Sequence, residues 1–299
     1  MRLGRAGSDG WRSFATLTPI VPISVIGGTA TRSATLYVPA KYSSTPSNVP
    51  LVLAFHGYGS NGPQQEKLSR LDLLADAHGC LVAYPDGLPV DPNEPNSGHF
   101  HWDANPGSAD VKFIGDLIKT LIDIYHYKVD TTRIYATGLS NGGGMANRVG
   151  CDLASVFAAI APVEGGYAEP GWAVCKPARS IPVITFHGTP DATVPYNGGL
   201  GTGAAAGIGF PSIPDWAAAW ALRDACNATP TVALYDNDPD VTVTTYSQCG
   251  GNASVVLYSI GDNGHAWPGS FMLGASHAIN ANTEMWKFFT QYAAPLPPP

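Results

Sequence analysis

The sequence predicts an α/β fold in which a mainly parallel central sheet is flanked by helices. Short apolar segments rich in β-branched residues alternate with longer segments in which apolar residues recur every three or four positions. Apolar residues make up 44% of the 299 residues, so the chain can bury a substantial core. We expect one large domain.

The strands are predicted from runs of apolar and β-branched residues that end in turn-forming residues. In chain order, these runs cover residues 34–39, 51–55, 80–85, 133–137, 157–163, 181–186 and 254–260. The stretch 231–247 carries the turn DNDPD and is expected to add a hairpin or edge strands. Most strands are separated by a helical segment, which favours parallel pairing.

The helix over residues 108–127 is the clearest, because Val111, Ile114 and Ile118 share one face and Ser108 can cap the first turn. Further helices are predicted at 64–78, 142–152, 214–225 and 276–292. Two long irregular segments, 86–107 and 188–213, follow strands. Loops of such length are usually functional or disordered, and α/β sheets carry their sites at this edge.

The charge pattern excludes several classes of partner. Only 13% of residues are charged and the formal net charge is -7, which argues against nucleic-acid binding and against a basic membrane anchor. No apolar run is long enough to span a bilayer. Residues 1–32 are expected to form an N-terminal extension with an altered signal region, since Pro19 and Pro22 interrupt its apolar patch. Residues 293–299 are expected to form a Pro-rich tail.

The five cysteines show no C-x-x-C spacing, which argues against a zinc or thioredoxin-type site. Pairing Cys151 with Cys175 and Cys226 with Cys249 closes short loops between predicted elements. We favour these two disulfides and leave Cys80 free in a strand. The alternative is five reduced cysteines in a cytosolic protein.

A candidate nucleophile lies where a predicted strand meets a predicted helix. The segment 138–142, GLSNG, matches G-x-S-x-G, and in the α/β-hydrolase fold this turn exposes a nucleophilic serine at the edge of the sheet. Ser140 is that serine. Gly138 and Gly142 leave room for the turn, while Gly143 and Gly144 allow the helix to pack closely on the strands.

A serine hydroxyl needs a base and an acid that orients the base, and in this fold they follow in the order Ser, Asp, His. Asp191 follows the strand 181–186, and His265 follows the strand 254–260. Taken singly, Asp191 can equally cap a turn and His265 can be a surface histidine. Asp262 competes for the role of the acid. We predict the triad Ser140, Asp191 and His265.

The oxyanion of acyl transfer also needs hydrogen-bond donors. The main-chain amide of Asn141 follows the nucleophile, and an HG-type turn follows the strand 51–55. We assign the amides of Tyr58 and Asn141 to the oxyanion hole, and His56 and Gly57 to the substrate site. The alternative is a glycine turn without a catalytic part.

Two loop tryptophans are candidates for binding substrate. Trp102 lies in a long loop and Trp267 comes two residues after the predicted base, so flat rings there could stack a phenolic acyl group or a sugar. The alternative is that each ring packs its loop down. The acidic run 236–240 lacks the glycine and glutamate of a calcium loop. We expect no metal and no cofactor.

Together, the segments FHGYGSNG, YPDG, TGLSNGGGMA, HGTPDATVPYNGG and GHAWPG resemble one esterase family. It comprises the feruloyl and acetylxylan esterases of carbohydrate esterase family 1 and the related polyhydroxybutyrate depolymerase-like esterases. The resemblance covers about residues 33–292 and implies an α/β-hydrolase catalytic domain there, with Ser140, Asp191 and His265 as its triad. It also implies a secreted enzyme that degrades plant cell-wall esters.

Tyr58 stands where depolymerase-like members often have cysteine, which favours a feruloyl or acetylxylan esterase. We therefore expect a feruloyl esterase that acts on polysaccharide-linked or small phenolic esters, as a monomer or homodimer. An acetylxylan esterase or a hydroxybutyrate-oligomer depolymerase is the alternative within the class. A non-catalytic glycan-binding protein on the same fold is the alternative outside it.

Overall fold

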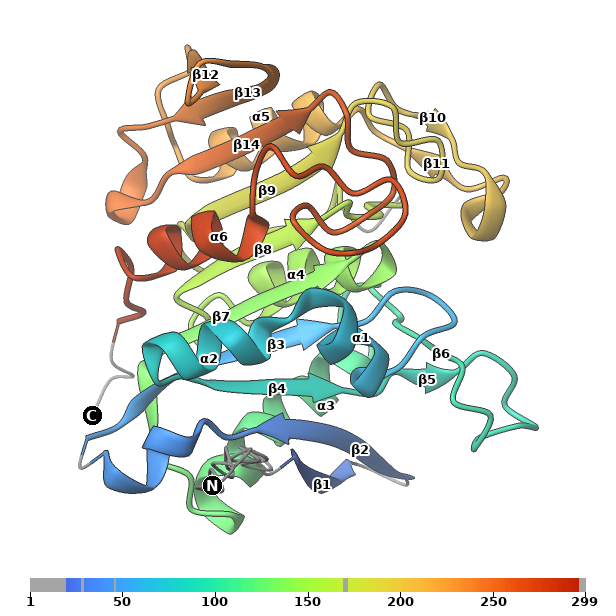
Figure 1. Cartoon of the computed structure of the whole chain (residues 1–299), viewed down its shortest axis with the longest axis vertical. Coiled ribbons are helices and arrows are strands. Elements are labelled where there is room, and N and C mark those ends of the chain that lie inside the picture. Colours follow the sequence, from blue (N-terminus) through green and yellow to red (C-terminus); the bar gives the residue numbers. More distant parts are fainter. Residues whose placement is uncertain (1–19, 28–29, 46, 169–171, 296–299) are drawn as a thin grey trace, which may run out of the picture.

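The computed structural model describes residues 20–27, 30–45, 47–168 and 172–295. These residues form a ten-stranded sheet with the order β1-β2-β4-β3-β7-β8-β9-β14-β13-β12 (Figure 1). Its strands are β1 (Ile20–Gly27), β2 (Ala30–Tyr37), β3 (Val49–Phe55), β4 (Leu81–Pro85), β7 (Val129–Leu139), β8 (Ala159–Val163), β9 (Val183–Gly188), β12 (Thr231–Tyr235), β13 (Asp238–Tyr246) and β14 (Val255–Ile260).

The centre of the sheet is parallel. From β4 through β3, β7, β8 and β9 to β14, each strand pairs in parallel with the next, while β1, β2, β12 and β13 pair antiparallel at the two edges. Every residue of β3, β8 and β9 is buried, as expected for strands covered on both faces. The predicted α/β class with a mainly parallel sheet is confirmed.

Helices cover both faces of the sheet (Figure 1). The core on one face contains side chains of α3 (Ala109–Lys119), α4 (Asn141–Asp152) and α5 (Ile213–Arg223). The core on the other face contains side chains of α2 (Leu71–His78) and α6 (Ala281–Phe289), with α1 (Gly62–Ser69) preceding α2. Parallel neighbours need such crossovers, which leaves the carboxyl ends of the central strands free for loops.

Two predicted helices differ from the structure. The helix predicted over 64–78 is split into α1 and α2 because Arg70 adopts a left-handed conformation with φ 53°. The helix predicted over 276–292 is shortened to α6 because the Asn280 side chain accepts a hydrogen bond from the Thr283 amide and caps it there. Ser108 caps α3 as predicted, and a π-helical turn over Thr120–Ile124 extends that helix.

The remaining elements lie in loops and at the edges. Residues 231–246 form the predicted hairpin, β12 with β13. Among the described residues the sheet begins with β1, which lies within the stretch predicted as an N-terminal extension. Each of the two long irregular segments contains a short antiparallel strand pair: β5 (Leu88–Pro89) with β6 (Phe100–His101), and β10 (Gly199–Leu200) with β11 (Gly209–Phe210). Short 3-10 turns cover Ala40–Ser44, Gly203–Ala205 and Gly250–Asn252.

The structure contains the two disulfides that were predicted from the sequence. Cys151 is bonded to Cys175 and Cys226 to Cys249, and Cys80 is free and buried. Burial raises the pKa of the Cys80 thiol to about 12, so this thiol is unreactive at neutral pH. No helix in the described part of the chain is long and apolar enough to cross a lipid bilayer.

Candidate active site

Ser140 occupies a strained turn between β7 and α4. Its backbone has φ 58° and ψ -117°, a conformation that side-chain-bearing residues rarely adopt. The turn is fixed by three main-chain hydrogen bonds: the Ser140 amide donates to Val163 O at 2.9 Å, and its carbonyl accepts from the amides of Gly144 and Gly166 at 3.0 Å. The surrounding backbone therefore holds the serine in the position that the G-x-S-x-G pattern predicts.

The glycines of this turn allow two backbones to approach closely. A Cβ atom on Gly142 would lie 2.2 Å from Phe55 O and 2.5 Å from His56 O, and one on Gly138 would lie 2.7 Å from Phe55 O. Each of these distances is a clash with backbone, which cannot move aside easily. Gly138 and Gly142 thus let the nucleophile turn pack against the end of β3.

Replacing Gly142 with alanine is expected to lower the free energy of unfolding by about 2 kcal/mol or more, because the new methyl group meets backbone oxygens. Denaturant unfolding measures this. The matched control is Gly115→Ala inside α3, where the new Cβ atom would have no heavy atom within 4 Å other than those of its own helix. This variant is expected to raise the free energy of unfolding by about 0.5–1 kcal/mol. Equal stability of the two variants would contradict the close approach.

The predicted acid and base meet. Asp191 follows β9 and His265 follows β14, and His265 Nδ1 donates to Asp191 Oδ2 at 2.7 Å. Asp191 Oδ1 accepts from the amides of Thr193 and Val194 at 2.8 and 3.1 Å. The competing acid, Asp262, is exposed and is not the partner of His265.

The Asp191 side chain is fully buried, and the His265 side chain is 22% exposed. Burial by itself would raise the pKa of Asp191, but hydrogen bonds from His187 and His265 outweigh it and lower that pKa below its usual range. The acid is therefore ionised at neutral pH. An ionised Asp191 fixes the proton of His265 on Nδ1 and leaves Nε2 as a proton acceptor.

Ser140 lies at the same edge of the sheet as this pair. It follows β7, and β7, β8, β9 and β14 are consecutive parallel strands whose carboxyl ends point the same way (Figure 1). In the described part of the chain, no hydrogen bond joins Ser140 Oγ to His265. Such bonds often form only when substrate is bound, so the arrangement still fits a serine and its base.

The loop after β3 lies beside the serine, as the oxyanion prediction requires. A Cβ atom on Gly57 would lie 3.7 Å from Ser140 Cβ, so the two backbones are neighbours. Among the described residues, the amides of Tyr58 and Asn141 donate to no protein acceptor. Two unpaired amides next to a candidate nucleophile are the donors that a developing oxyanion needs.

His56 holds this loop in place. Its ring is fully buried, its Nε2 accepts from the Gly87 amide at 3.0 Å, and its Nδ1 donates to Gly57 O at 2.8 Å. Both ring nitrogens are used within the protein. The structure therefore gives His56 a role in holding this loop, and its contact with substrate stays a prediction; Gly57 is the member of the pair that borders Ser140.

Burial lowers the pKa of His56 to about 4. The unfolded chain binds that proton near pH 6.5, so the stability from the neutral ring is complete above pH 6.5 and is lost toward pH 4. Between these two pH values the free energy of unfolding should fall by about 3 kcal/mol because of His56. His56→Gln should remove this pH dependence. Denaturant unfolding across this pH range tests this, with exposed His277→Gln as control. A wild-type pH dependence in His56→Gln would contradict the assignment.

Trp102 is 3% exposed and joins the oxyanion loop to the serine turn. Its indole donates to His56 O at 3.0 Å, and its main chain exchanges two hydrogen bonds with the Asn141 side chain, at 2.7 and 3.0 Å. It lines a cleft of about 390 Å³ together with Asn141, Tyr167 and Trp172. Trp102 therefore forms part of the wall of that cleft, but most of its ring is buried against the rest of the protein.

Trp267 does not face this cleft. It is 1% exposed, and its indole donates to the Asn282 side chain at 2.9 Å. It lines a larger hollow of about 650 Å³, which lies against α2 and α6 and contains none of Ser140, Asp191 and His265. The ring anchors the His265 loop to α6, and the stacking of Trp267 on substrate stays a prediction.

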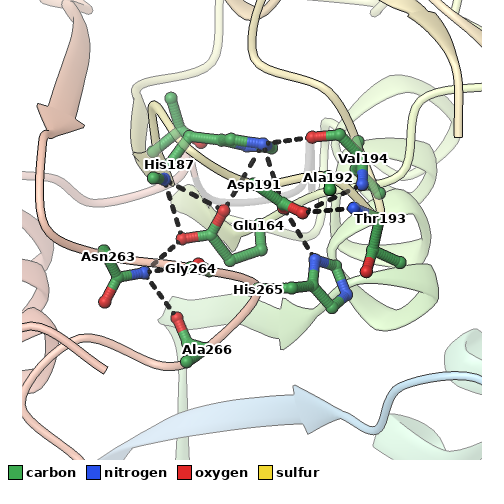
Figure 2. A network of polar contacts seen from close by, with 12 residues as sticks. Glu164, His187, Asp191, Ala192, Thr193, Val194, Asn263, Gly264, His265 and Ala266 are labelled. Atoms are coloured by element: carbon green, nitrogen blue, oxygen red, sulfur yellow. Dashed lines mark hydrogen bonds and ion pairs between the residues drawn. The ribbon is translucent and has the colours of Figure 1, made fainter. Parts of the chain in front are cut away.

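A buried polar network that was not predicted from the sequence lies behind the Asp191–His265 pair (Figure 2). It contains Glu164, which follows β8, and His187 and Asn263, which lie near the ends of β9 and β14. One signal was present: Glu164 is an acidic residue placed directly after a fully apolar strand, at the edge where the site lies.

Comparisons with known proteins find similar sequences among esterases. A family model described as esterase PHB depolymerase matches residues 32–173. Feruloyl esterase B of Piromyces equi is 32% identical over 82% of this chain, and the match covers 42% of that protein. Probable feruloyl esterase C of Aspergillus clavatus is 29% identical over 86% of this chain and 83% of its own length.

Among solved structures, acetyl xylan esterase from Aspergillus awamori superposes with a TM-score of 0.64 at 17% identity, covering 90% of this chain and 99% of that one. At that identity the likeness concerns the fold, which is the α/β-hydrolase fold. This chain spans less than half the length of the Piromyces relative.

Proposed function

This chain is a relative of the feruloyl, acetylxylan and polyhydroxybutyrate depolymerase-like esterases, and we propose that it is a serine hydrolase of carboxylic esters. The observation that carries the proposal is the hydrogen bond from His265 Nδ1 to Asp191 Oδ2, formed at the sheet edge where Ser140 sits in a strained turn. A binding protein on this fold would need neither feature.

The reaction follows from the proton positions. His265 Nε2 takes the proton of Ser140 Oγ as that oxygen attacks the ester carbonyl carbon, and the negative oxygen is bound by the amides of Tyr58 and Asn141. The imidazolium, held by Asp191, then protonates the departing alkoxide and leaves an acyl group on Ser140. Water, deprotonated by His265, attacks the acyl group and releases the acid and free Ser140.

The substrate is proposed to be a phenolic ester of plant cell-wall polysaccharide, such as a feruloyl ester. The cleft beside Asn141 is walled by Trp102, Tyr167 and Trp172, and aromatic walls suit a flat acyl group. Acetylxylan esters and hydroxybutyrate oligomers are the second candidates, favoured by the names of the relatives. Two disulfides support secretion.

Rates on methyl ferulate, acetylated xylan and a hydroxybutyrate trimer test the substrate. We expect kcat/KM for methyl ferulate to exceed that for each of the other two at least about fivefold, since one well-packed aromatic contact is worth about 1 kcal/mol. A higher rate on either of the others would replace the feruloyl assignment and leave the esterase intact. Activity on none of the three, nor on short p-nitrophenyl esters, would contradict the esterase itself.

A further inference from the structure

A buried carboxyl group that the proposed reaction does not use lies behind Asp191. Glu164 follows β8 and is fully buried. Its backbone has φ 45°, which is unfavourable for a residue with a side chain. Burying a carboxyl group on strained backbone is unfavourable unless the contacts that it makes compensate. Those contacts join two loops (Figure 2).

The first set of contacts reaches the loop of the acid. The Gly188 amide donates to both carboxyl oxygens of Glu164, at 2.9 and 3.0 Å. Gly188 is the last residue of β9, and its own position is tight, because a Cβ there would lie 1.8 Å from Asn263 O. Glu164 therefore fixes the point at which the chain leaves the sheet toward Asp191.

The second set reaches the loop of the base. Asn263 Nδ2 donates to Glu164 Oε1 at 2.6 Å, and the same Nδ2 contacts the carbonyls of Gly264 and Ala266 at 2.9 Å. Those two carbonyls flank His265. The Asn263 Oδ1 in turn accepts from the Ser276 amide at 2.7 Å. Glu164 thus holds the side chain that fixes the backbone on both sides of the base.

A second buried histidine lies between the two carboxyl groups. His187 Nε2 is 2.9 Å from Val194 O and 3.4 Å from both Glu164 Oε2 and Asp191 Oδ2. The Val194 carbonyl can only accept, so Nε2 carries a proton and donates. His187 and Asp191 are the titratable groups that face Glu164 among the described residues, with His265 beyond Asp191.

Two neighbouring buried carboxyl groups do not both ionise at neutral pH. Asp191 is the ionised one, because it accepts hydrogen bonds from two histidines. Burial, and after it the negative charge of Asp191, raises the pKa of Glu164 well above its usual range. Glu164 therefore keeps its proton and has one hydrogen to donate.

We propose that Glu164 is a positioning residue that, in its protonated form, couples the loop of Asp191 to the loop of His265. The proposal rests on the proposed function, because it concerns how the same triad is held. As an acceptor, Glu164 binds the Gly188 amide and Asn263; as a donor, it directs its proton toward Asp191. It touches no substrate and acts only through the acid and the base.

The same side chains could instead hold a cation, since Glu164, His187 and Asp191 each bring one ligand atom within 4.8 Å of the others. A cation would compete with the hydrogen bonds from His265 and Gly188 that already occupy these oxygens. We favour the hydrogen-bonded arrangement. Activity that is lost on dialysis against a chelator and restored by a divalent metal would contradict it.

The test compares Glu164→Gln with Glu164→Ala in the full chain. Glutamine keeps the neutral charge and most of the contacts: its Oε1 can accept from Gly188 and Asn263, and its Nε2 can donate toward Asp191, while only the second contact from the Gly188 amide is lost. We expect Glu164→Ala to lower kcat for p-nitrophenyl acetate about 30-fold with KM changed less than about threefold, because misplacing a base by about 1 Å costs up to about 100-fold. Glu164→Gln should restore kcat to within about threefold of wild type.

The pH profile tests separately whether the Glu164 side chain is neutral while the enzyme works. Because the wild-type side chain and its glutamine replacement are both neutral, the acidic limb of kcat/KM should lie at the same pH in both. An acidic limb displaced by more than about half a pH unit in Glu164→Gln, or a glutamine variant as slow as the alanine variant, would overturn the proposal. Wild-type kcat in Glu164→Ala would overturn it too.

If Glu164→Ala does not fold, the glutamine variant still decides, through its kcat and pH profile at an unchanged Tm. The failure of this inference also differs from the failure of the proposed function. An inactive wild-type chain would contradict the esterase. An active wild-type chain with a slow glutamine variant would contradict only the role of Glu164.

Discussion

Replacing Ser140 with alanine is expected to lower kcat for p-nitrophenyl acetate by at least about 10⁴-fold. The hydroxyl is the only group of this side chain, and the proposed reaction needs it as the nucleophile. The two amides of the oxyanion hole cannot form an acyl-enzyme without it. The variant keeps the turn, because the three main-chain hydrogen bonds of Ser140 do not involve its side chain. Steady-state rates on purified protein measure the loss.

The matched control is Ser44→Ala, which removes an exposed hydroxyl in a 3-10 turn away from the site. It should leave kcat and Tm unchanged. Tm of Ser140→Ala should also stay within about 2 °C of wild type, so a lost rate cannot be assigned to unfolding. Ester hydrolysis that persists at more than about a tenth of the wild-type rate would rule out Ser140 as the nucleophile.

Replacing Asp191 with asparagine is expected to lower kcat about 10⁴-fold through the tautomer of His265. Asp191 Oδ1 accepts from the amides of Thr193 and Val194, so the asparagine oxygen must take that place and its NH₂ group must face His265. His265 then accepts through Nδ1 and carries its proton on Nε2. In that form it cannot take the proton of Ser140.

Asp262→Asn is the matched control for the acid, because Asp262 lies close to His265 in the sequence but is exposed. Its kcat should stay within about threefold of wild type. The pattern that would contradict the assignment is the reverse one, in which Asp262→Asn is inactive and Asp191→Asn retains activity. Rates measured side by side at one pH distinguish the two patterns.

Local sequence patterns were sufficient to predict the elements that place the site. The junction of strand and helix at Ser140 is visible because β-branched residues stop at Gly138 and small residues follow. Asp191 and His265 could be placed because each follows a buried apolar strand. The carboxyl ends of parallel strands share one edge, so residues far apart in the sequence meet there.

Other features depended on packing between segments and were not visible in the sequence. The break at Arg70 falls inside an apolar pattern that suits a single helix, and only the backbone conformation reveals it. The burial of Trp267 could not be predicted because it depends on α6, which reaches the His265 loop from a distant part of the sequence. Glu164 was missed because a hydrogen-bond network among three strand ends leaves no local pattern.

The central claim is that Ser140 becomes acylated, and trapping the acyl-enzyme tests it most directly. Wild-type protein is mixed with p-nitrophenyl butyrate, quenched in acid within the first turnovers, digested and analysed by mass spectrometry. We predict one butyryl group per chain, on the peptide that contains Ser140, and none in Ser140→Ala. A butyryl group on another residue, or rapid hydrolysis by Ser140→Ala, would contradict the account.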